Sequence, residues 1–164
     1  MKSFFIIINI LFIMSGCATK NAFSKFDMNR EQELSASNLQ SSKIISGEKV
    51  EGVCSAVYLN DVYPASFNQN EYFLVSIYLK NKQKMYDPNS LDDINLVLKL
   101  NTKLPLKIKQ LPHANQFSHL ISIQNNWTNY YLVAFEEEEG ENLSLVLENG
   151  QSSSAELKYQ KDEQ

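Results

Sequence analysis

Two histidines are the first side chains whose type and spacing suggest chemistry. His113 and His119 stand six residues apart, in a segment that reads as a loop entering a strand. Imidazole is a common zinc ligand, but a zinc site needs at least three protein ligands, and a third would have to come from elsewhere in the chain. We therefore interpret both histidines as solvated loop residues and predict no metal site.

The densest run of charge lies at 136–139, where four glutamates stand in a row, with Glu141 just beyond them. Carboxylates bind Ca²⁺, but this spacing lacks the alternating Asp or Asn residues and the glycine of a calcium loop. We interpret the run as the solvated tip of a hairpin between strands at 130–137 and 143–148. An acidic tip could also meet a basic partner, and such binding would be sensitive to salt.

Motifs that carry catalysis are missing from the sequence. It contains no G-x-S-x-G turn, no H-E-x-x-H and no C-x-x-C, which mark activated serines, zinc peptidases and dithiol redox sites. Glycine occurs only five times, which disfavours the glycine-rich loops that cradle phosphates. We predict that the protein is not an enzyme and takes no cofactor.

Three aromatic residues, Trp127, Tyr130 and Tyr131, form the partner-binding surface that the sequence predicts. They stand among several asparagines, and large, rigid, amphipathic side chains beside small polar ones are typical of recognition surfaces. A large aromatic residue also often fills the middle of a β-sandwich. Trp127 could therefore belong to the core or its edge, and the sequence leaves both interpretations open.

The second of the two cysteines, Cys54, lies in the apolar stretch 53–58. A free cysteine in such a stretch packs as a small hydrophobic residue, so we predict a buried and inert thiol. The other cysteine is Cys17. If the thiol of Cys17 carries a lipid, as its surroundings below indicate, Cys54 has no disulfide partner within the chain. An intermolecular disulfide in an oxidising compartment is the alternative.

The segment before Cys17 is typical of a signal peptide. Lys2 supplies a positive charge, and residues 4–14 form an apolar run that is broken only by Asn9. This run fits the window of about 7–15 residues for the apolar part of a secretory signal. It falls short of the ~20 apolar residues that a membrane-spanning helix needs.

The apolar run ends in Met14-Ser15-Gly16-Cys17, which resembles the lipobox of bacterial lipoproteins, with Met14 where leucine is usual. The resemblance implies cleavage of residues 1–16 and attachment of a diacylglyceryl group to the nucleophilic thiol of Cys17. Two or more acyl chains anchor a protein stably to a membrane. Ala18 follows the cysteine, where aspartate often signals retention in the inner membrane, so the resemblance favours the outer membrane of the cell envelope.

Beyond the anchor, the sequence divides into a linker at 17–43 and one folded domain at 44–164. The linker is polar and rich in Ser and Asn, which is typical of a spacer. A short helix over 28–39, capped by Asp27, is the alternative. The domain shows short runs of period two separated by turn residues, so we predict an all-β, immunoglobulin-like or transthyretin-like β-sandwich of about 7–8 strands.

Two of these runs carry a predicted position in the sheet. The run at 71–81 is apolar on both faces, so we place it at the centre. Pro105 cannot donate to a strand ladder, so it places the run at 104–109 at an edge or a strand start, where Lys107 and Lys109 would guard the edge. The charged tail from Tyr159 to Gln164 is expected to fray.

The net charge of −4 argues against nucleic acid as a partner, because phosphates demand basic surfaces. The sequence thus predicts an envelope lipoprotein held to the membrane by lipid on Cys17. As its role we predict a non-enzymatic accessory module that binds an envelope or surface protein. A surface-exposed adhesin and a carrier of a small apolar ligand between two sheets are the alternatives.

Overall fold

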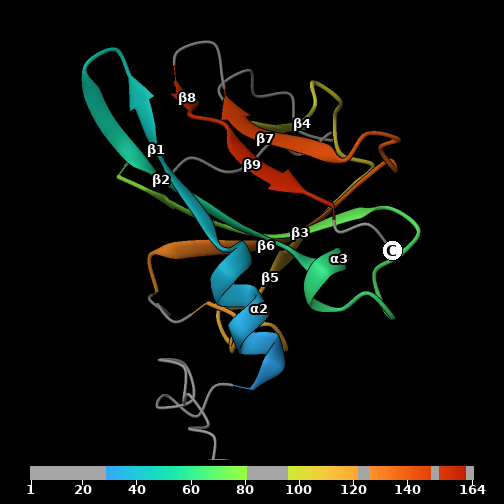
Figure 1. The fold of residues 1–164 in the computed structure, drawn as a ribbon. Helices are drawn as coiled ribbons and strands as arrows, with labels where there is room; N and C mark the ends of the chain where they lie inside the picture. The colour runs from blue at the N-terminus through green and yellow to red at the C-terminus, as the bar shows by residue number, and fades with distance from the viewer. Residues whose placement is uncertain (1–28, 81–95, 122–125, 149–151, 162–164) are drawn as a thin grey trace, which may run out of the picture.

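The structure is a computed structural model that describes residues 29–80, 96–121, 126–148 and 152–161 (Figure 1). Cys17 and the segment before it lie outside these residues. The helices are α2 (Arg30–Asn38) and α3 (Leu59–Val62). The strands are β1 (Gln40–Ser46), β2 (Lys49–Tyr58), β3 (Glu71–Leu79), β4 (Val97–Leu100), β5 (Lys107–Leu111), β6 (Thr128–Phe135), β7 (Asn142–Glu148), β8 (Ser153–Ser154) and β9 (Leu157–Gln160). Neither α2 nor α3 is long and apolar enough to cross a bilayer.

All nine strands belong to one antiparallel sheet, in the order β4-β7-β8-β1-β2-β3-β6-β5, with β9 pairing with β7. A mostly β fold of short strands is therefore confirmed. The two-sheet sandwich, whether immunoglobulin-like or transthyretin-like, is wrong. The sheet is continuous and curls into a half-barrel, so that β7 and β9 lie above β2 and β3 (Figure 1).

Side chains of β1 keep the sheet continuous where it curls. Ile44 and Ile45 pair with β8 through the backbone. Further back along β1, the hydroxyl of Ser42 accepts a hydrogen bond from the amide of Ala155 at 2.9 Å. The side-chain amide of Gln40 bonds the backbone of Lys158 in both directions. The ladder can therefore bend at this point while the amide of Ala155 and both backbone groups of Lys158 keep hydrogen-bond partners.

The packed part of the chain begins before Ile44, within the segment that we assigned to the linker. The helix that the sequence offered as an alternative is present as α2, and its N-cap is Asn29. The Asn29 side chain accepts from the amide of Gln32 at 2.8 Å, and the Gln32 side chain accepts from the amide of Asn29 at 3.0 Å. This reciprocal pair satisfies two amides at the start of the helix. Asp27 lies outside the described residues.

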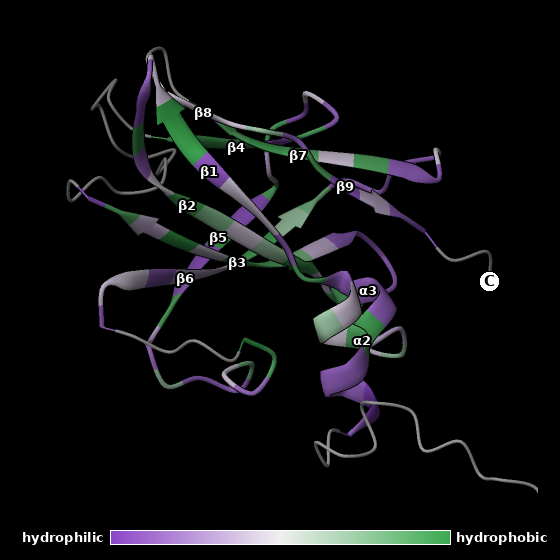
Figure 2. Cartoon of the chain, turned by 60° about the vertical axis from the view of Figure 1, so that its left-hand side comes forward, coloured by the Kyte–Doolittle hydropathy of each residue, from purple (hydrophilic) through white to green (hydrophobic). Residues whose placement is uncertain are grey.

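The curled sheet buries side chains on both of its faces. On the concave side, residues such as Cys54, Phe73 and Leu145 meet in the larger cluster. On the convex side, a second cluster brings together side chains of the sheet, such as Leu74, with side chains of α3 and of the segment 112–121, such as Phe117. Helix α2 packs against this cluster through Leu34. Hydrophobic and hydrophilic residues alternate along several strands (Figure 2). Strand β3 is buried on both faces, which confirms its predicted central position.

Strands β6 and β7 do not pair with each other, so the hairpin predicted across 138–142 is wrong, and the observed connection is 136–141. β6 pairs with β3 and β5, whereas β7 pairs with β4, β8 and β9. The segment is a crossover between the two halves of the curled sheet. A short polar connection between two alternating runs looks the same in both arrangements, which explains the error.

Two further predictions concern the edge and the tail. β5 is the last strand in the order, so the edge position is confirmed, although the strand begins at Lys107. The tail is ordered as far as Lys161, because β9 pairs with β7 and Tyr159 is buried, with its hydroxyl donating to the carbonyl of Ala56 at 2.7 Å. Fraying from Tyr159 is therefore wrong.

Candidate functional site

A polar cleft of about 380 Å³ opens between α2, α3, the segment 64–70 and the crossover 136–141. Its charged lining is Arg30, Asp61, Glu71, Glu137 and Lys161. Amides from Asn60, Asn68 and Asn70 and an apolar wall of Leu34, Pro64 and Phe67 complete most of the surface. The cleft lies at the end of the sheet where β2 ends and β3 begins.

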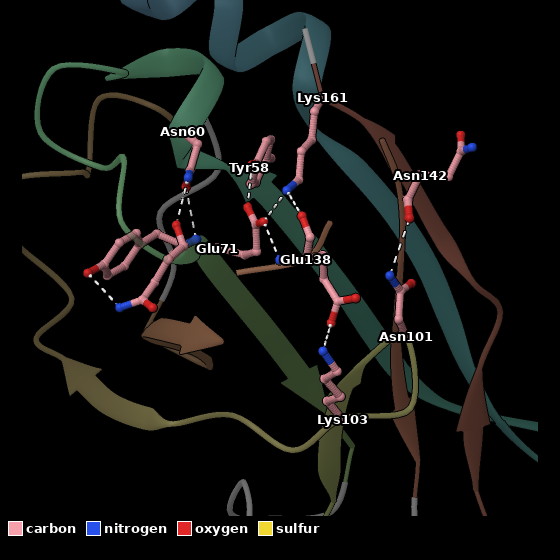
Figure 3. A network of polar contacts seen from close by, with 10 residues as sticks. Tyr58, Asn60, Glu71, Asn101, Lys103, Glu138, Asn142 and Lys161 are labelled. Carbon is pink, nitrogen blue, oxygen red and sulfur yellow. Dashed lines mark hydrogen bonds and ion pairs between the residues drawn. The ribbon is translucent and has the colours of Figure 1, made fainter. Parts of the chain in front are cut away.

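Glu71, the first residue of β3, is a buried carboxylate in this cleft and is 2% exposed. Its Oε2 accepts a hydrogen bond from the hydroxyl of Tyr58 at 2.5 Å. Its Oε1 lies 2.5 Å from Nζ of Lys161 and accepts from the amide of Glu138 at 2.9 Å (Figure 3). A buried charge is tolerated when it is paired and hydrogen-bonded, and both oxygens of Glu71 meet that condition.

The contacts of Glu71 make it a poor candidate for a general base. A general base must present a lone pair to a substrate proton, and the oxygens of Glu71 already accept three contacts. Burial, together with the hydrogen bond to Glu71, raises the pKa of Tyr58 well above its usual range. The Tyr58 phenol therefore stays protonated and is a poor nucleophile.

The same network ties together three parts of the chain that are distant in sequence. Nζ of Lys161 also donates to the carbonyl of Glu138. The carboxylate of Glu138 in turn lies 3.0 Å from Nζ of Lys103, and their hydrogen bond raises the pKa of that lysine (Figure 3). The end of β9, the crossover and the turn after β4 are thus held in one arrangement.

The side wall of the cleft is fixed by Asn60. Its amide nitrogen donates to the carbonyl of Asn70 at 2.7 Å, and its oxygen accepts from the amide of Tyr72 at 2.9 Å. These bonds fasten α3 to the start of β3. By contrast, Arg30 and Glu137 are exposed and form no ion pair with another described residue. The cleft therefore has a rigid floor and free charges at its rim.

The structure does not bring Trp127, Tyr130 and Tyr131 together as one surface. Trp127 is 76% exposed, whereas the two tyrosines are 4% and 5% exposed. Tyr131 belongs to the concave cluster and Tyr130 to the convex one, because neighbouring residues of a strand point to opposite faces. The core interpretation of Trp127 is wrong, and a binding surface that includes the tyrosines is wrong as well.

Trp127 instead directly precedes β6, at the end of the sheet where two partly exposed apolar residues, Val53 and Tyr78, pair across the strands. Tyr78 pairs across the strands with both Val53 and Thr128, the residue after Trp127. Val53 is 37% exposed and Tyr78 is 36% exposed. We refer to Val53, Tyr78 and Trp127 as the Trp127 end of the sheet.

The two histidines are exposed and lie in the segment that covers the convex cluster, so their interpretation as loop residues is confirmed. Nε2 of His119 forms a hydrogen bond with the hydroxyl of Tyr63 at 2.7 Å. The ring of His113 packs edge-on against Tyr130. Within the described ranges, no group of three potential metal ligands occurs.

Cys54 is fully buried with a free thiol, which confirms a buried side chain. Burial raises the pKa of Cys54 from 9.0 to about 12. Since the thiolate is the reactive form, we expect Cys54 of the folded mature chain carrying Cys17→Ser to react at pH 8 with a soluble disulfide reagent at least about 10³-fold more slowly than in the urea-unfolded chain. As the pH rises, the thiol of Cys54 ionises in the unfolded chain before it does in the folded chain. The contribution of Cys54 to the free energy of unfolding is therefore present below pH 9 and is lost between pH 9 and about 12. Equal rates for folded and unfolded chains would contradict the burial.

Sequence analysis missed the residues that build the cleft. Glu71 carried one usable signal, because a carboxylate at the start of a strand that is apolar on both faces must find a partner when buried. Lys161 carried none, since it lies in a charged tail. Tyr58 reads as an ordinary strand residue.

No protein-family model matches the chain, and no curated protein or solved structure matches it either.

Proposed function

We propose that the protein is a lipid-anchored, non-enzymatic accessory protein of the cell envelope that binds a partner protein through the Trp127 end. The observation that supports the binding surface is the 76% exposure of Trp127 beside exposed Val53 and Tyr78. Tryptophan and tyrosine dominate the energetics of protein interfaces, because they bury a large area with few rotatable bonds. An exposed tryptophan at the same end of the sheet as these apolar side chains is a suitable anchor for a partner.

The proposed location rests on the N-terminal sequence. The lipobox-like Met14-Ser15-Gly16-Cys17 supports lipid on Cys17, and Ala18 supports the outer membrane. Twelve residues, 18–29, separate Cys17 from the start of α2. At about 3.3–3.6 Å per extended residue, such a tether would keep the folded part within about 40 Å of the bilayer.

A protein partner fits the described surface better than a small apolar ligand carried inside the fold. The cleft of about 380 Å³ is lined by charged and amide side chains, which an apolar ligand would leave without partners at a cost. The saturated carboxylate of Glu71 supports a non-enzymatic role.

Site-specific photo-crosslinking in living cells tests this proposal. A photoreactive phenylalanine analogue at the exposed position of Asn126 is expected to give one defined adduct with an envelope protein. The adduct should be lost when Trp127→Ala is added. The same analogue at exposed Glu156 is the matched control and should give no such adduct.

Cys17→Ala tests the anchor in the same cells. The unlipidated protein should leave the membrane fraction, and the adduct should weaken because the local concentration of the protein at the membrane falls. An adduct that survives Trp127→Ala would overturn the surface. Identical fractionation of Cys17→Ala and the wild type would overturn the location.

A further inference from the structure

Independently of the Trp127 end, we propose that the polar cleft binds a neutral saccharide. The cleft, of about 380 Å³, falls at the lower end of the range of roughly 300–1,000 Å³ that is typical of small-molecule sites. It involves no residue of the Trp127 end. The proposal rests on the charge balance, the hydrogen-bonding groups and the apolar wall of the cleft.

The charges of the cleft favour a neutral ligand. Glu71 and Lys161 neutralise each other at 2.5 Å. At the rim, the cation of Arg30 is accompanied by the carboxylates of Glu137 and Asp61. An anionic ligand would meet the rim carboxylates and a cationic one would meet Arg30. A neutral ligand avoids the cost of desolvating a charge of its own.

The hydrogen-bonding groups favour a ligand rich in hydroxyls. A hydroxyl both donates and accepts, so it can use the acceptors and donors that the cleft mixes. The exposed side-chain amide of Asn68 can both donate and accept hydrogen bonds. The guanidinium of Arg30 supplies several donors, and the carboxylate of Glu137 supplies two acceptor oxygens. An aliphatic ligand would leave these groups unsatisfied.

The apolar wall supplies a flat surface for the C–H face of a sugar ring. The ring of Phe67 is held by Tyr72, with ring centroids 4.9 Å apart, and by Tyr63 and Phe117 at 6.3 and 6.1 Å. Pro64 continues the wall. Because the neighbouring rings hold Phe67 in place, the surface is preorganised, and little ordering entropy is lost when a ligand binds.

Titration of the ¹⁵N-labelled mature chain, with Cys17→Ser to avoid lipid, tests the proposal. The probes are maltotriose, cellotriose and tri-N-acetylchitotriose, each up to about 10 mM, a range that detects even millimolar affinity. At least one probe should shift the amide signals of Asn60, Asn68 and Glu71 in a saturable manner. Phe67→Ala and Asn68→Ala should each weaken its binding about fivefold or more.

Two controls separate this result from the proposed function and from non-specific binding. Trp127→Ala should leave the titration unchanged, so failure at one surface does not imply failure at the other. Trigalacturonate, a trisaccharide with three negative charges, should bind at least about tenfold more weakly. Absence of saturable shifts with all three neutral probes, binding that survives Phe67→Ala, or equal binding of trigalacturonate would each overturn the proposal.

Discussion

Replacing Glu71 by Gln is expected to lower the free energy of unfolding by about 3 kcal/mol. The amide keeps the shape of the carboxylate but removes its charge. Its NH₂ group cannot pair with the ammonium of Lys161, and if it faces Tyr58 instead, the tyrosine hydroxyl must turn from donor to acceptor. Removing one member of a buried ion pair costs roughly 3–5 kcal/mol, because the other charge is left uncompensated. The side chain of Lys161 is 24% exposed, so water partly solvates it and the lower end of that range applies. Urea denaturation followed by circular dichroism measures the change.

Glu137→Gln is the matched control, since it makes the same chemical change in the same cleft at an exposed position. Its effect should stay within about 0.5 kcal/mol. Adding Lys161→Met to Glu71→Gln should recover part of the loss, because the uncompensated cation is then gone. If Glu71→Gln proves as mild as Glu137→Gln, the ion pair does not hold the cleft together.

The period-two pattern allowed most of the strands to be predicted, because alternation records which side chains face a core. It placed β3, β6 and β7 within a few residues of their observed bounds. The pattern holds no information on whether two layers belong to one sheet. That depends on Gln40 and Ser42, whose bonds to β9 and to Ala155 span more than a hundred residues.

The candidate site was harder to predict than the fold for a related physical reason. The partners of Glu71 come from β2, the crossover and the end of β9, so the cleft exists only once the sheet has curled. Aromatic composition did predict an exposed Trp127, as one of two alternatives. It failed for Tyr130 and Tyr131, because strand alternation sends them into opposite cores.

Gly52→Ala is expected to destabilise the protein by about 3 kcal/mol or more. Gly52 lies in β2, between Ile44 of β1 and Leu79 of β3. A Cβ at this position would overlap the carbonyl oxygen of Tyr78 and would lie 2.9 Å from Cδ2 of Leu79. Overpacking a core costs typically 1–3 kcal/mol, and the clash here is with backbone, which cannot rotate away as a side chain can. Urea denaturation measures the loss.

Gly140→Ala supplies the control, because a Cβ there meets nothing within 4 Å and the substitution should change stability by less than about 0.5 kcal/mol. Hydrogen exchange adds a readout that a general loss of stability would not give. If β2 and β3 must part at Gly52, the amide of Lys80, which donates to the carbonyl of Glu51 at 2.8 Å, should lose protection before the amides of β7 do. Equal urea midpoints for Gly52→Ala and Gly140→Ala would mean that β2 and β3 lie further apart at this point than the structure places them.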